Sequence, residues 1–164
     1  MQNSDYANQL DTISRYQAVI EFNLDGTVVK ANDNFLKALG YGMDEIRGQH
    51  HSMFVDPAER GTPEYRAFWD ALRRGEYQAR QLKRITKEGR EIWIQASYNP
   101  INDIRGNPMK VVKFATDVTN QRDLAQRVKE ISNVVSSAAS EMRATAESMA
   151  RTASESTQQA SAVA

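Results

Sequence analysis

Hydrophobic and polar positions divide this chain into two parts with different periods. Before about residue 120, short apolar runs alternate with turn residues, and every Trp, Tyr, Phe, Pro and Gly lies in this part. From Asn120 onward the residues are mainly Ala, Ser, Thr, Glu, Gln and Arg, with sparse aliphatic positions at helical spacing. The first part therefore predicts a globular domain, and the second predicts a long helix.

The globular part contains both strand and helix patterns. Alternation predicts five strands, at residues 18–22, 28–31, 77–86, 91–100 and 109–118. An Asp-Gly turn at Asp25 and Gly26 joins the first two strands. Helical spacing predicts helices or helical turns at residues 5–15, after Asn32, at 43–48 and at 63–74. This order favours an α+β fold, a five-stranded antiparallel sheet with short helices on one face.

The tail shows a heptad pattern of alternating spacings of four and three. The repeating positions are Leu124, Val128, Ile131, Val135, Ala138, Met142, Thr145, Met149 and Thr152. A stripe this narrow and long favours a coiled coil between two copies of the chain, a parallel homodimer. A single amphipathic helix lying back on its own domain is the alternative. The large seam residues of the predicted dimer are Leu124, Val128, Ile131, Val135, Met142 and Met149.

Composition excludes several classes of protein. Lys and Arg number 21, as do Asp and Glu, and this balance argues against nucleic acid as the main partner. The chain has no Cys, so disulfides and thiolate metal sites are excluded. No apolar run is long enough to cross a bilayer, and the first residues lack the pattern of a secretory signal. We expect a cytoplasmic protein that is not an enzyme, because no nucleophile, phosphate-loop or metal motif is present.

Several short motifs together resemble a PAS domain. They are Leu24-Asp25-Gly26, Ala31-Asn32-Asp33-Asn34-Phe35, Asp44-Glu45-Ile46-Arg47-Gly48, Asn99-Pro100 and Asp117-Val118-Thr119. The resemblance covers residues 17–119. Residues 1–16 resemble a linker between tandem PAS domains. Residues 120–164 resemble the start of the signalling helix of methyl-accepting chemotaxis proteins.

The combined resemblance implies a sensory domain of a chemotaxis or aerotaxis receptor that relays the state of its pocket to a dimeric stalk. It also implies a chemotaxis kinase and its adaptor as partners, bound through a downstream region. Two alternatives stay open. One is a PAS dimerisation module without a ligand, and the other is a PAS sensor of a histidine kinase or nucleotide cyclase.

A narrower resemblance is to the PAS domain of flavin-binding aerotaxis transducers. Trp69, Leu72, Gly75 and Glu76 match its W-x-x-L-x-x-G-E pattern, and Lys87, Gly89 and Trp93 match its K-x-G-x-x-x-W pattern. That family carries a basic-His-Pro-Asp segment where this chain has Val55-Asp56-Pro57-Ala58. The resemblance implies FAD as a cofactor. By residue type, the candidate contacts for a bound cofactor are Trp69, Trp93, Asn34, Gln95 and His51. Core packing is the alternative for the two tryptophans.

The two histidines suggest a different cofactor. His50 and His51 lie in the irregular segment 49–57, and imidazole is a common axial ligand of haem iron. The structural alternative is that one histidine caps a turn and the other is solvated. The sequence leaves FAD, haem, another small molecule and no ligand as open alternatives.

The end of the last strand is a candidate transmission point. Asp117, Val118 and Thr119 lie where the predicted sheet becomes the predicted stalk. We expect these residues to pass a change in the sheet to the helix. Simple capping of the helix by Thr119 or Asn120 is the alternative reading, and both roles are compatible.

Overall fold

The computed structural model describes residues 12–162 and divides the chain into two compact units after Asn120. Residues 12–16 are helical, and the rest of the helix predicted at 5–15 lies outside the described residues. The first unit contains the sheet and its short helices. In the second, residues 121–162 belong to one long helix.

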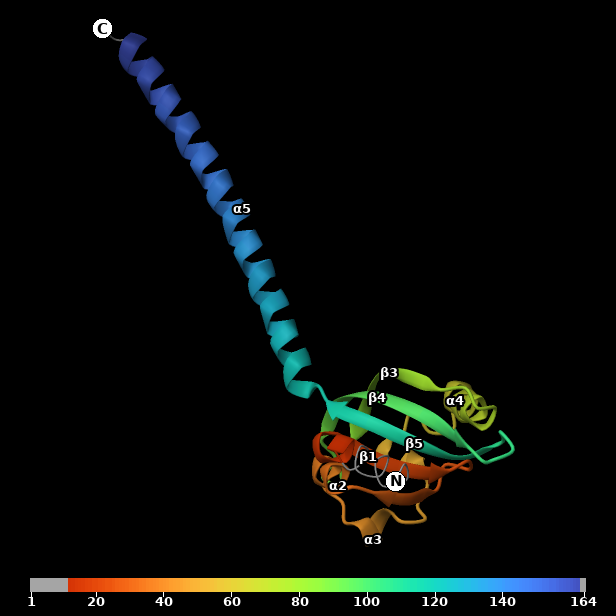
Figure 1. The fold of residues 1–164 in the computed structure, drawn as a ribbon. Coiled ribbons are helices and arrows are strands. Elements are labelled where there is room, and N and C mark those ends of the chain that lie inside the picture. Colours follow the sequence, from red (N-terminus) through yellow and green to blue (C-terminus); the bar gives the residue numbers. More distant parts are fainter. Residues whose placement is uncertain (1–11, 163–164) are drawn as a thin grey trace. The chain divides into compact units, whose positions relative to one another are not determined.

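The sheet has five strands in the order β2-β1-β5-β4-β3, and all neighbouring pairs are antiparallel (Figure 1). The strands are β1 (Ala18–Asn23), β2 (Val28–Ala31), β3 (Gln78–Ile85), β4 (Glu91–Asn102) and β5 (Pro108–Asp117). This arrangement confirms the predicted five-stranded antiparallel sheet. The first strand in the sequence, β1, pairs with the last, β5, in the middle of the sheet.

Short helices connect β2 to β3, and a long helix follows β5. They are α2 (Asp33–Leu39), α3 (Met43–Ile46), the 3-10 helix η1 (His51–Phe54), α4 (Pro63–Arg73) and α5 (Thr119–Ala162). The Asn32 side chain caps α2 by accepting from the Phe35 N–H at 3.0 Å, as predicted, and Gly40 ends α2 with a φ of 78°. The segment predicted as irregular contains η1.

One face of the sheet packs against the short helices and forms the core. Along β4, the core-facing residues are Ile92, Ile94, Ala96 and Tyr98, the alternation that the sequence predicts. From the helices the core receives Phe35, Leu39, Ile46, Phe54, Phe68, Trp69 and Leu72. The core therefore lies between the sheet and the helices α2, α3, η1 and α4.

The β1–β2 hairpin holds η1 in place. The Gly26 carbonyl accepts from the His51 N–H at 2.8 Å, and the Val28 N–H donates to the Gln49 carbonyl at 2.9 Å. Gly26 has a φ of 88°, and a Cβ there would lie 2.6 Å from His50 Nε2. A side chain at Gly26 is therefore disfavoured by its backbone conformation and by the close approach of the imidazole.

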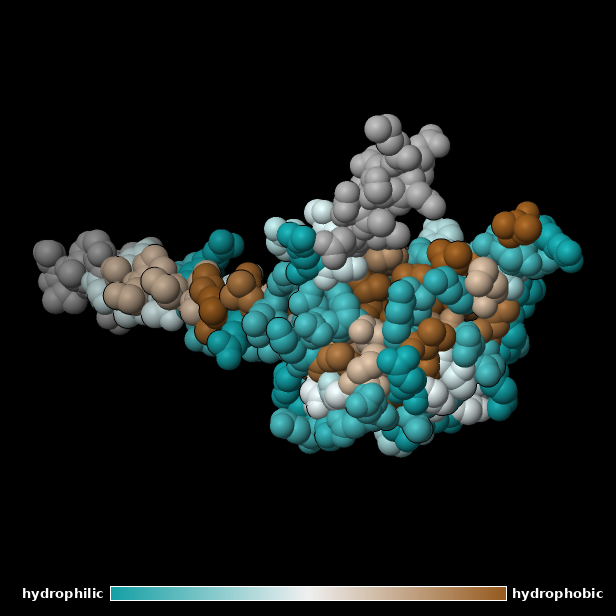
Figure 2. Space-filling model, turned by 60° about the horizontal axis from the view of Figure 1, so that its bottom comes forward, coloured by the Kyte–Doolittle hydropathy of each residue, from teal (hydrophilic) through white to brown (hydrophobic). Residues whose placement is uncertain are grey.

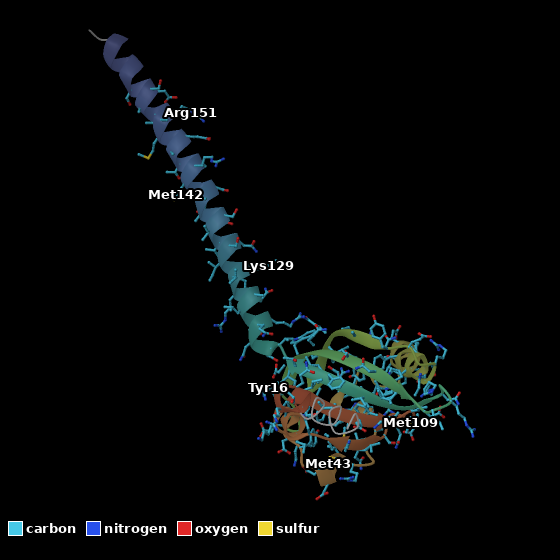
Figure 3. All side chains as sticks on the ribbon, viewed as in Figure 1. Tyr16, Met43, Met109, Lys129, Met142 and Arg151 are labelled. Carbon is cyan, nitrogen blue, oxygen red and sulfur yellow. The ribbon has the colours of Figure 1, made fainter. Side chains whose placement is uncertain are left out.

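Helix α5 carries its large apolar side chains on the surface of the single chain. Leu124, Val128 and Ile131 are each about 60% exposed, with values of 63%, 58% and 63%. Figure 2 shows hydrophobic surface along this helix, and Figure 3 shows its side chains, among them Lys129 and Met142, standing away from the helix axis. No helix within residues 12–162 combines the length and apolar character needed to cross a bilayer.

Candidate functional site

A polar cluster lies inside the aromatic core. Among the described residues, the buried polar or charged side chains are His51, Arg84, Thr86 and Lys113. Three of them surround the side chain of Tyr98, which is itself 0% exposed. His51 comes from η1, Arg84 from β3 and Lys113 from β5, whereas Tyr98 lies on β4 between those strands. The antiparallel pairing sets Tyr98 opposite Lys113.

A chain of hydrogen bonds runs through this cluster, and each group donates to the next. Arg84 Nη2 donates to the Tyr98 hydroxyl at 2.9 Å. The Tyr98 hydroxyl lies 3.0 Å from His51 Nε2, and His51 Nδ1 lies 2.8 Å from the Tyr65 hydroxyl. Because Tyr98 already accepts from a guanidinium, the consistent assignment has Tyr98 donate to Nε2 of a neutral His51. His51 then donates from Nδ1 to Tyr65, which is half-buried.

Positive charge dominates the electrostatics of the cluster. Burial lowers the pKa of His51 well below 6.5, and the charges of Arg84 and Lys113 lower it further, so the imidazole is neutral. Burial also lowers the pKa of Lys113 to about 8. Burial raises the pKa of Tyr98, but Arg84 and Lys113 outweigh that effect, and the net pKa is below its usual value.

Aromatic rings enclose the cluster. The His51 ring lies 5.3 Å from Phe22, 5.4 Å from Trp69 and 6.3 Å from Phe68, measured between centroids. The Lys113 Nζ lies 4.9 Å from the centroid of the Tyr98 ring and 5.7 Å from that of Phe35. These rings keep water out and offer their π faces to the ammonium group.

The structure brings together only some of the predicted contact residues. Trp69 and His51 lie in the core on the helical side of the sheet, with their rings 5.4 Å apart. Trp93 and Gln95 lie on the opposite face of β4, because side chains alternate and Ile94 and Ala96 face the core. The Asn34 amide donates to main-chain carbonyls of residues 14, 15 and 17. The candidate flavin contacts therefore form no single site.

The candidate haem ligands and the candidate FAD contacts lie at different places in this arrangement. Both ring nitrogens of His51 are engaged by tyrosine hydroxyls, and Nδ1 of His50 lies 2.9 Å from Ser52 Oγ. Nε2 of His50 faces Gly26. Both ring nitrogens of the buried His51 are thus engaged, the exposed His50 lies outside the buried cluster, and the residues proposed for FAD lie on two faces of the sheet.

A second set of contacts fixes the exit from the sheet into α5. The Val118 N–H donates to the Trp93 carbonyl at 2.8 Å, and the Trp93 N–H donates to Thr119 Oγ1 at 2.9 Å. Asp117 Oδ1 accepts from the Thr119 N–H at 2.8 Å and from its hydroxyl at 2.6 Å. Thr119 is therefore bonded to both β4 and the end of β5, a tighter junction than capping alone.

The sequence reading missed Arg84, Lys113, Tyr98 and Tyr65. A signal existed for Lys113, since alternation along β5 puts it between Val111 and Ala115, on the apolar face. A lysine in that position predicts a buried charge. Tyr65 and Tyr98 gave no such signal, because their hydroxyls meet His51 only through contacts across 14 and 47 residues of chain.

The sequence matches a known protein family and several characterised proteins. A family model described as "PAS fold" matches residues 28–115. The biofilm dispersion protein BdlA of Pseudomonas aeruginosa is 40% identical over 146 residues, which make up 89% of this chain and 35% of that protein. The aerotaxis receptor of Escherichia coli K12 is 29% identical over 79 residues, 48% of this chain and 15% of the receptor. The chain thus spans only a part of each relative.

Solved structures show the same fold. A light-oxygen-voltage domain studied with a flavin analogue superimposes with a TM-score of 0.60. The match covers 79% of this chain and 96% of that domain, at 22% sequence identity. At this identity the likeness concerns the arrangement of strands and helices alone.

Proposed function

The chain belongs to the PAS fold family, and from that premise we propose that it senses a signal in its core and relays it to a dimeric helical stalk. Its similarity to a dispersion protein and an aerotaxis receptor supports a sensory rather than an enzymatic role. We propose a chemotaxis kinase and its adaptor as the downstream partners, reached through the stalk, and a cytoplasmic location.

One observation carries the relay: the strands that hold the buried cluster also hold the exit junction. β4 carries Tyr98 in the core and bonds Val118 and Thr119 through the main chain of Trp93. β5 carries Lys113 and ends at Asp117. A shift of either strand that changes the contact between Tyr98 and Lys113 therefore acts on the bonds that start α5.

The relay is a two-state equilibrium. In one state Lys113 and Arg84 bracket Tyr98 as observed, and Thr119 is bonded to Trp93 and Asp117. A change in the charge of the cluster moves β4 relative to β5 and weakens the Thr119 contacts. The start of α5 then rotates or shifts, and the seam between two stalks changes register.

Cross-linking along the stalk tests this proposal. The chain has no Cys, so Ile131→Cys introduces a single thiol at a predicted seam position. We expect Lys113→Met to change the rate of disulfide formation between two copies by about fivefold or more, a coupling of roughly 1 kcal/mol. Lys110→Met removes a lysine of the same strand that pairs with Glu21 at 2.7 Å, and serves as control.

The alternative of a dimerisation module without a sensory role predicts a different result. Cross-linking would then occur at the same rate in Ile131→Cys alone and in Ile131→Cys combined with Lys113→Met or Lys110→Met. Absence of any cross-link at Ile131→Cys would instead remove the dimeric stalk on which the relay depends.

A further inference from the structure

The core contains buried positive charge without a buried carboxylate. Arg84 is 3% exposed and Lys113 is 1% exposed, and no Asp or Glu of the described residues is buried. Among the described residues, the hydrogen-bond partners of Arg84 are neutral groups, the Tyr98 hydroxyl and the Lys83 carbonyl at 2.6 Å. Buried cations are normally paired with an anion, because an unpaired buried charge is strongly destabilising.

Hydrogen-bond donors also outnumber acceptors around the cluster. Arg84 Nε and Trp69 Nε1 are both buried without a hydrogen-bond partner among the described residues. Trp69 is 3% exposed, and its ring packs against His51 at 5.4 Å. Unpaired buried donors are rare, and each one needs an explanation. Arg84 and Lys113 lie around Tyr98 in the same core, so these unpaired donors favour an acceptor group that carries negative charge.

We propose that this cluster binds a small ligand bearing a carboxylate, which accepts hydrogen bonds from Arg84, Lys113 and the Trp69 indole. A guanidinium offers Nε and a neighbouring Nη as a fork that matches two carboxylate oxygens. Arg84 has Nε unbonded, whereas its Nη atoms are held by Tyr98 and Lys83. This inference rests on the proposed function, because it names the chemical class sensed by the same site.

Two residues connect the cluster with the protein surface. Tyr65 is the half-buried member of the hydrogen-bond chain, at the start of α4. The exposed Arg80 guanidinium lies 5.0 Å over the Phe68 ring, which in turn lies 4.9 Å from the Tyr98 ring. Arg80 thus extends the positive charge of Arg84 outward along β3.

The proposal also explains the ionisation of Lys113. The groups that face it are Tyr98 on β4, Phe35 on α2, and Arg84 on β3 through its charge, with His51 beyond Tyr98. None of these is a carboxylate, and burial lowers the pKa of Lys113 to about 8, so the lysine is mainly neutral above that pH. Arrival of a carboxylate favours the ammonium form, and binding above pH 8 is accompanied by proton uptake.

Nuclear magnetic resonance of the indole N–H tests the proposal on the full chain. Trp93→Phe leaves Trp69 as the single tryptophan. Sodium acetate is the probe, replacing sodium chloride at constant ionic strength and pH 7. We expect a saturable downfield shift of the Trp69 indole proton, as an acceptor reaches the free Nε1–H.

Three variants in that background identify the charges involved. Lys113→Met and Arg84→Met should each weaken acetate binding about tenfold or more, the effect of losing a charge-assisted hydrogen bond. Lys110→Met should leave the half-saturating concentration unchanged. Replacement of a buried cation by methionine commonly preserves or raises stability, so the variants are expected to fold.

Two results would overturn the proposal. One is no saturable shift when acetate replaces chloride, which means that the site has no preference for a carboxylate. The other is equal acetate binding in all three variants. Neither result depends on the stalk, so failure here leaves the cross-linking test of the relay intact, and failure of the relay leaves this site intact.

Discussion

At the scale of the residue, Lys113 links the buried cluster to the pH dependence of stability. Burial lowers its pKa from 10.5 to about 8. Between these pH values the folded protein binds fewer protons than the unfolded chain. The free energy of unfolding therefore rises as pH increases from 8 to 10.5, by about 3 kcal/mol in total.

The variant Lys113→Met should lose this rise and should be about 1–3 kcal/mol more stable than the parent at pH 7, because no buried charge remains. Urea denaturation at several pH values from 7 to 10.5 measures both effects. Lys110→Met, a half-buried lysine on the same strand, should follow the parent curve. Parallel curves for the parent and Lys113→Met would show that Lys113 is not a buried, titrating group.

The Tyr98 hydroxyl should contribute to stability through two buried partners. Tyr98→Phe removes the acceptor for Arg84 and the donor for His51 Nε2, and leaves both groups unpaired in the core. We expect a loss of about 1–3 kcal/mol in the free energy of unfolding. Tyr16→Phe, at a side chain that is 84% exposed, should be neutral in the same urea experiment. Equal stability of Tyr98→Phe and the parent would contradict the assigned hydrogen bonds.

The sequence predicted which residue types belong to the candidate site better than it predicted where their side chains lie. The sequence pointed to His51 and Trp69 because histidine and tryptophan are common at ligand sites, and the structure places both in the core cluster. It also pointed to Trp93 and Gln95, which share one face of β4. Alternation predicts that two residues share a face, but which face is covered depends on tertiary packing.

At the scale of the element, the folding pattern follows from local chemistry. The Asp-Gly turn and the capping residue Asn32 define their elements because a turn or a cap needs only nearby residues. The 3-10 turn η1 is different. Its first residue, His51, bonds to Gly26, and Gln49 just before it bonds to Val28, so both contacts are with the β1–β2 hairpin. Its position therefore depends on contacts that no local pattern contains.

The hairpin contact gives a prediction about Gly26. Alanine at either Gly26 or Gly106 is strained by a positive φ, at a cost of about 1–2 kcal/mol. A Cβ at Gly106 meets no atom within 4 Å, whereas one at Gly26 meets His50 at 2.6 Å. Gly26→Ala should therefore cost about 1–3 kcal/mol more than Gly106→Ala in urea denaturation. Similar losses of stability for the two variants would show that the His50 side chain does not restrict the space at Gly26.

At the scale of the whole molecule, α5 has a stripe of apolar side chains that are exposed in the single chain. Val128, Ile131 and Val135 recur at heptad spacing, and each is about 60% exposed, with values of 58%, 63% and 61%. Packing this stripe against a second stalk removes it from water, which is the driving force proposed for dimerisation.

A charge in the stripe should prevent this association. Ile131→Lys should shift the chain from dimer to monomer in sedimentation equilibrium, with an increase in the dissociation constant of about tenfold or more, because a buried lysine opposes its copy across the seam. Glu130→Lys adds a lysine at the neighbouring position and should leave the dimer intact. Equal dissociation in both variants would place the interface elsewhere on the chain.

The relay from the core cluster to the stalk is the central claim, and a double-mutant cycle tests it most directly. Spin labels on Val135→Cys report the distance between two stalks by pulsed electron resonance. They are compared in the parent, Lys113→Met, Thr119→Val and the double variant. Thr119→Val keeps the shape of the side chain but removes the hydroxyl bonded to Trp93 and Asp117.

The account predicts that Lys113→Met changes the distance distribution when Thr119 is present and has little effect when it is valine. Thr116→Val, on an exposed residue of β5, should preserve the response. A response to Lys113→Met of equal size with and without the Thr119 hydroxyl would contradict the relay through this junction.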